Sequence, residues 1–91
     1  MYAAVVKLMI DPAQAPAAAA VFTTQILPRI TSAEGFCSGH WLDPSNGEGL
    51  GIVVFETELQ ARRLAQPTFD WAAPGVTILT VDVRRVAVSL P

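Results

Sequence analysis

The sequence predicts an α+β fold in which one domain, residues 1–91, has the element order strand, helix, strand, strand, helix, strand. Three observations predict this order. Turn-forming residues from Asp43 to Gly47 separate two apolar runs, which is typical of a β-hairpin because proline presets one turn dihedral and Asn-Gly tolerates positive φ. A capping-box sequence from Thr57 to Gln60 then indicates the start of a helix. Before the hairpin, apolar residues recur at helical spacing.

The first strand is predicted over Tyr2 to Ile10, where every residue except Lys7 is apolar. Such a run is typical of a strand that is buried on both faces. Lys7 has two interpretations. Its stem can pack at the rim of the sheet or of a dimer while its ammonium group stays in solvent, or it can contact an anion inside a pocket.

The first helix is predicted from about Gln14 to about Ser32. Pro28 lies inside this segment, removes a backbone donor and is expected to kink the helix or end its regular part. An apolar stripe that recurs every four residues predicts the buried side of the helix, and it consists of Ala18, Phe22, Ile26 and Ile30.

The hairpin strands are predicted over residues 35–42 and 50–55. This stretch holds the only histidine, the only cysteine and one of the two tryptophans of the chain. Strict alternation along the first of these strands would put Phe36, Ser38, His40 and Leu42 on one face. Cys37, Gly39 and Trp41 would then lie on the other face.

The second helix is predicted to run from the Thr57 cap to about Ala65 or Gln66. The connector from Gln66 to Gly75 carries two large aromatic residues and is expected to fold down over an apolar surface. The last strand is predicted over Val76 to Val88. This length exceeds the usual five or six residues, so either a bulge interrupts the strand or its end pairs beyond its own sheet.

This order of elements is that of the ferredoxin-like plait. Right-handed crossovers would place both helices on one face of a four-stranded antiparallel sheet, with strand order 4-1-3-2. The other face of the sheet would have no cover. The chain is 52% hydrophobic and only 15% charged, and its first and last strands are apolar. We therefore expect a homodimer joined through the uncovered sheet face.

Composition also argues against several classes of protein. A net charge of −2 with only six basic residues argues against nucleic-acid binding. A single cysteine excludes an internal disulfide framework and a multi-cysteine metal site. No apolar run approaches the roughly 20 residues that span a bilayer, and Lys7 interrupts the only run that resembles a signal peptide. We expect a soluble cytoplasmic protein that has no metal, no cofactor and no membrane contact.

Four residues are candidates for a functional site. His40 is the candidate catalytic residue, because imidazole ordinarily titrates near neutral pH and can act as a general base; the alternative is a partly exposed histidine at the rim of the hairpin or dimer. Trp41 and Trp71 are candidates for binding an apolar substrate by stacking, and the alternative is ordinary core packing. Arg84 and Asp82 could pair with each other as i, i+2 neighbours, bridge to a second subunit, or orient a polar ligand. By alternation, both residues would share a face with Val76, Ile78 and Thr80.

The chain resembles the dimeric α/β-barrel superfamily, in particular its small antibiotic-biosynthesis-monooxygenase-like members. Besides the order of elements, three segments carry the resemblance, which covers nearly the whole chain. They are Leu27-Pro28-Arg29 late in the first helix, Gly35-Phe36-x-x-Gly39-x-Trp41 at the start of the hairpin, and Val53-Val54-Phe55-Glu56 before the capped helix.

The resemblance implies two plaits packed sheet to sheet as a barrel, each with a pocket between its sheet and its helices. Relatives include cofactor-free oxygenases, haem-degrading enzymes, isomerases and members with no assigned activity. The oxygenases use an asparagine, whereas the only asparagine here is Asn46 in the hairpin turn. Two hypotheses follow. One is a cofactor-independent monooxygenase-like enzyme that acts on an electron-rich aromatic molecule, and the other is a non-catalytic dimeric module for ligand binding or assembly.

Overall fold

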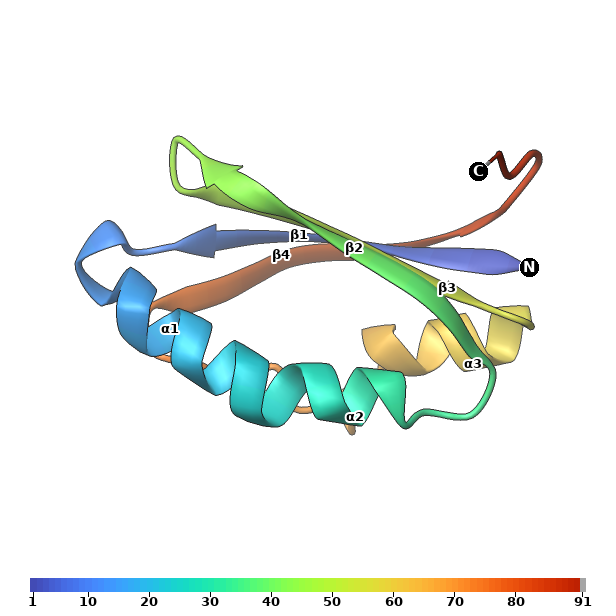
Figure 1. Ribbon diagram of the computed structural model, residues 1–91, viewed down its shortest axis with the longest axis horizontal. Coiled ribbons are helices and arrows are strands. Elements are labelled where there is room, and N and C mark those ends of the chain that lie inside the picture. Colours follow the sequence, from blue (N-terminus) through green and yellow to red (C-terminus); the bar gives the residue numbers. More distant parts are fainter. Residues whose placement is uncertain (91) are drawn as a thin grey trace.

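A four-stranded antiparallel sheet and a layer of helices on one of its faces make up the fold (Figure 1). The computed structural model describes residues 1–90. The strands are β1 (Tyr2–Ile10), β2 (Phe36–Ser45), β3 (Glu48–Phe55) and β4 (Val76–Arg85), in the spatial order β2-β3-β1-β4. This confirms the predicted order of strands, and the arrangement is consistent with a ferredoxin-like plait.

The first helical segment continues through Pro28. It consists of a 3-10 turn (Pro12–Gln14), α1 (Ala15–Val21), a π-helical turn (Phe22–Ile26) and α2 (Leu27–Thr31). The Leu27 N–H donates to the Phe22 carbonyl oxygen, five residues back. Because this widened turn comes directly before Pro28, the proline ring avoids the carbonyl group of the preceding turn. The predicted disturbance at Pro28 is therefore a π-helical turn, and the helix goes on to Thr31.

A bulge in β4 corrects the predicted alternation of that strand. Lys7 of β1 pairs with Thr80 and Leu8 pairs with Ile78, so Leu79 is the extra residue. Beyond this bulge, Asp82 and Arg84 lie on the opposite face of the sheet from Val76 and Ile78. The prediction that all four share a face is therefore wrong, whereas the bulge itself was one of the two alternatives for this long strand.

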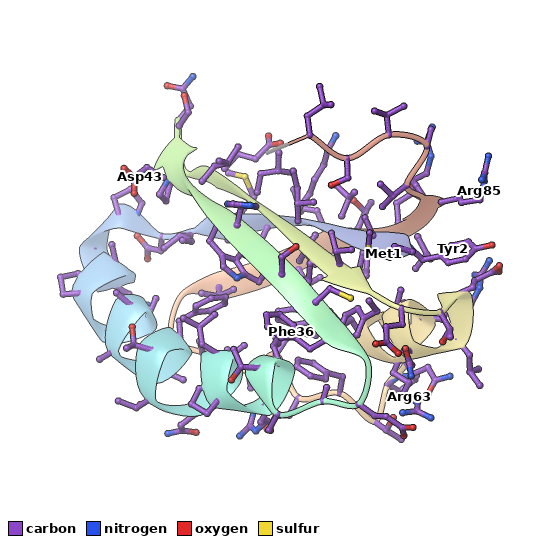
Figure 2. The ribbon with its side chains drawn as sticks, turned by 45° about the vertical axis from the view of Figure 1, so that its right-hand side comes forward. Met1, Tyr2, Phe36, Asp43, Arg63 and Arg85 are labelled. Atoms are coloured by element: carbon purple, nitrogen blue, oxygen red, sulfur yellow. The ribbon has the colours of Figure 1, made fainter. Side chains whose placement is uncertain are left out.

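A second irregularity, in β2, corrects the predicted faces of the hairpin. Phe36 pairs with Phe55 and Ser38 pairs with Val54, so Cys37 is the extra residue. Phe36 consequently lies on the helix side of the sheet, where its ring contacts Phe55 edge-on at 6.2 Å between centroids (Figure 2). The prediction that Phe36 shares a face with His40 is wrong for this reason.

The helix-covered face of the sheet holds the core. The buried cluster combines residues of β1 and β3 with residues from both helical segments: Ala4, Ile26, Ile30, Val53, Phe55, Ala61 and Leu64. The opposite face, here called the open face, carries no helix within residues 1–90 (Figure 1). It carries Ala3, Val5, Lys7 and Met9 of β1, Ser38, His40 and Leu42 of β2, Glu48, Leu50, Ile52 and Val54 of β3, and Thr77, Thr80, Asp82 and Arg84 of β4.

The second helical segment is α3 (Glu58–Arg62), extended by a 3-10 turn (Arg63–Ala65). Its predicted capping box is confirmed, because the Gln60 N–H donates to Thr57 Oγ1 at 3.2 Å and the Thr57 N–H donates to Gln60 Oε1 at 3.1 Å. These bonds satisfy two of the donors that a helix N-terminus leaves unpaired. Within residues 1–90, no helix has the length and apolarity needed to cross a membrane.

The connector between α3 and β4 folds down onto the core, as its aromatic residues predicted. The Trp71 indole N–H donates to the Leu64 carbonyl oxygen at 2.9 Å, and Phe69 stacks against Trp71 with centroids 4.6 Å apart. Arg29 of α2 donates to the Asp70 carbonyl oxygen at 2.9 Å. The connector is thus held from both helical segments.

Candidate functional site

A cleft of about 330 Å³ opens between the first helical segment and the hairpin end of the sheet. We call it the helix–hairpin cleft. One wall is formed by Ala15, Ala18, Ala19, Phe22 and Thr23 of the helical segment. The sheet contributes Leu8 and Ile10 of β1, Trp41, Leu42, Asp43 and Pro44 of β2, Gly49 and Leu50 of β3, and Val76 of β4.

The cleft exists because small residues face each other across it. Alanines stand at three helical positions of its wall, and Gly49 stands on the strand opposite. A Cβ atom at Gly49 would lie 2.9 Å from Leu8 Cδ1, so a side chain there would displace Leu8, which also lines the cleft. Part of the space that longer side chains would fill beside the helix is therefore open.

The inner wall of the cleft is an aromatic cluster centred on Trp41. Its indole lies over Gly51 so closely that a Cβ atom there would overlap the ring. Phe22 meets the indole edge-on, with centroids 4.6 Å apart, and Trp71 meets it at 6.1 Å. Edge-to-face contacts of this kind are favourable because the positive edge of one ring meets the negative face of the other. Three separate segments therefore hold Trp41 in place.

Two polar side chains line the cleft, and only one of them is ionisable. Thr23 comes from the first turn of the π-helical segment, and Asp43 comes from the end of β2. Figure 2 shows Asp43 at the hairpin end of the molecule, beside the start of the first helical segment. Since the rest of the lining is apolar, the cleft offers a largely apolar surface with one hydroxyl group and one carboxylate.

The four residues singled out from the sequence lie in two different places. Trp41 lines the cleft and Trp71 packs behind it, so these two are brought together. His40 is exposed on the open face, opposite Ile52. Arg84 also lies on the open face, with Nη1 3.4 Å from Asp82 Oδ2. Neither His40 nor Arg84 lines the cleft.

Sequence reasoning missed the helical wall and Asp43. Phe22 and Thr23 belong to the only π-helical turn of residues 1–90, and a signal for it was present in Pro28, which disfavours a regular preceding turn. Asp43 was interpreted only as a turn former. No group of three or more histidine, cysteine, aspartate or glutamate side chains with the geometry of a metal site occurs within residues 1–90.

The chain matches no family model, and no curated protein matches it.

Replacement of Gly51 by alanine should displace Trp41 and disturb the cleft wall. Because the new methyl group overlaps the indole, we expect a loss of about 1–3 kcal/mol in the free energy of unfolding, typical of overpacking. The near-ultraviolet circular dichroism of the tryptophans should change as well. Urea unfolding and the dichroism spectrum measure both effects.

Gly39→Ala is the matched control, because its Cβ would meet nothing closer than 3.7 Å on the same face of the sheet. The free energy of unfolding of this variant should lie within about 0.5 kcal/mol of that of the wild type. Equal effects of the two substitutions would contradict the packing of Trp41 on Gly51.

Proposed function

We propose that the protein binds a small, largely apolar aromatic molecule in the helix–hairpin cleft. The observation that carries this proposal is the cleft itself, with about 330 Å³ of space and an aromatic inner wall. Ligand pockets typically measure about 300–1,000 Å³, and a cavity of about 150 Å³ holds a benzene molecule. The cleft therefore suits a ligand of one or two fused rings.

The lining also restricts the charge of the ligand. Asp43 is its only ionisable side chain, so an anionic ligand would meet a carboxylate and no cation. A neutral molecule with a hydroxyl or amino group fits better, because Thr23 and Asp43 can accept a hydrogen bond from it. The π-helical turn that carries Phe22 and Thr23 supports a functional role for this wall, since π-turns occur frequently at functional sites.

Filling the cleft should abolish binding of a neutral aromatic probe. Ala19 is exposed and lines the cleft, whereas Ala20 is its exposed neighbour and does not. We expect Ala19→Phe to raise the dissociation constant for 2-naphthol at least tenfold, measured by calorimetry, and Ala20→Phe to leave it unchanged. The anion 2-naphthoate should bind the wild type more weakly than 2-naphthol. Equal binding by both variants would remove the cleft as the binding site.

Oxygenation of the bound molecule is the second candidate function. Asp43 favours it, because a carboxylate beside the ligand can accept a phenolic proton. The substrate would be an electron-rich polyphenol that supplies the electrons itself. One oxygen atom of O₂ would replace two hydrogen atoms at a carbon of its keto form, giving a carbonyl group, and the other oxygen atom would leave as water.

Oxygen uptake with a panel of polyphenols tests the second candidate. We expect uptake by the wild type, and its loss in Ala19→Phe with retention in Ala20→Phe. His40→Ala tests the base predicted from the sequence, and its uptake should be unchanged because His40 lies on the open face and does not line the cleft. Unchanged uptake in His40→Ala would remove that assignment, while no uptake by the wild type would leave the binding function alone.

We also propose that two copies associate through the open face, as the resemblance to dimeric α/β barrels implies. The support is that this face presents Val5, Leu50, Ile52 and Val54, which are only partly buried within one chain. Contiguous apolar surface of this kind is typical of an interface. A two-fold arrangement would bury the same surface on both subunits.

Light scattering after gel filtration should give twice the 9.7 kDa mass of the chain at micromolar concentration. Ile52→Lys should leave no dimer and yield unfolded or aggregated protein, because a charge would enter the centre of the interface. Leu59→Lys is the control, since Leu59 is 63% exposed on α3, on the other side of the sheet. A stable wild-type monomer would contradict the proposed dimer.

A further inference from the structure

Charged side chains of both signs gather at one place on the open face. A hollow of about 510 Å³ on this face is lined by Val5, Lys7, Thr80, Val81, Asp82 and Arg84. Lys7 comes from β1 and the other charged residues from β4, and the register places Lys7 opposite Thr80. Both signs of charge are therefore present together in the hollow.

Within one subunit, two of the three charged side chains of the hollow form an ion pair and the third does not. Arg84 Nη1 lies 3.4 Å from Asp82 Oδ2, so Asp82 and Arg84 form a pair. Lys7 takes part in no ion pair within residues 1–90. An unpaired ammonium group is well hydrated in solvent and carries no free-energy penalty there. Burying it beneath a second sheet is strongly unfavourable. Covering Lys7 on association through the open face therefore favours a carboxylate close to its ammonium group.

We infer that Lys7 pairs with Asp82 of a second copy of this chain, and Asp82 with Lys7 of that copy; this inference rests on the proposed dimer. In a two-fold interface, if one residue contacts a second across the axis, the second contacts the first in return. Lys7 and Asp82 line the same hollow, so an axis through the hollow brings each opposite the copy of the other. Each Asp82 carboxylate would then pair with Arg84 of its own subunit and with Lys7 of the other copy.

The remaining titratable groups of the open face fit this role less well. Glu48 pairs with Met9 at the hairpin end and does not line the hollow. His40 lies on β2, at the far edge of the sheet from β4. Cross-subunit pairs at the hollow would fix the register of the two faces, because apolar contacts have no preferred direction whereas charge complementarity selects one arrangement among many.

A charge swap tests the inference. Lys7→Glu and Asp82→Lys should each raise the dimer dissociation constant at least tenfold, measured by sedimentation equilibrium, or yield unfolded or aggregated protein. The double variant Lys7→Glu/Asp82→Lys should restore a folded dimer whose dissociation constant lies within about threefold of the wild type, because the reciprocal pairs form again with reversed sign. The matched control is Lys7→Glu/Glu48→Lys, which restores the same net charge and should not restore the dimer.

The possible results distinguish the Lys7–Asp82 pairing from the dimer itself. A wild-type dimer whose double variant stays dissociated or unfolded overturns the pairing and leaves the dimer standing, as does rescue by the Glu48→Lys control. Single variants that associate as tightly as the wild type also overturn the pairing. A monomeric wild type at micromolar concentration overturns the dimer itself.

Discussion

The packing of Trp41 on Gly51 is the contact on which the site depends. The indole needs a neighbouring strand position with no side chain, and Gly51 provides it. From there the ring reaches Phe22 of the helical segment and Trp71 of the connector. One side chain of β2 thus joins the sheet, the first helical segment and the connector, and its remaining surface forms the inner wall of the cleft. Any change in its position would alter all three contacts and the shape of the cleft together.

Most of the fold could be predicted from local signals. The hairpin and the capping box each arise from a few adjacent residues whose backbone preferences agree, and the element order then restricts the sheet to few topologies. The faces of β2 and β4 could not be predicted in the same way. The bulges at Cys37 and Leu79 depend on which residues stand opposite them in β3 and β1, and one extra residue reverses every side chain beyond it.

The site was harder to predict because the cleft lies where the side chains of the helix and of the sheet are small. A sequence pattern shows which residues are apolar, but the open space beside Ala18 and Ala19 depends on where the helix lies over Gly49. Pro28 indicated a disturbed helix, yet the same proline is compatible with a kink, an end or a widened turn. Trp41 was identified because a large aromatic residue is informative by itself. Its partner Gly51 is informative only once the two strands are paired.

The cleft and the hollow lie on opposite faces of one sheet, and this separates their functions. Side chains alternate along β1, so Leu8 reaches the cleft while Lys7 reaches the hollow. Leu42 and Leu50 are the exceptions, because both lie on the open face and also line the cleft. For substitutions at other positions that keep the backbone pairing, ligand binding and association should be independent. If the two were coupled, the coupling would have to pass through the strands themselves, because they are the only elements that contribute to both faces.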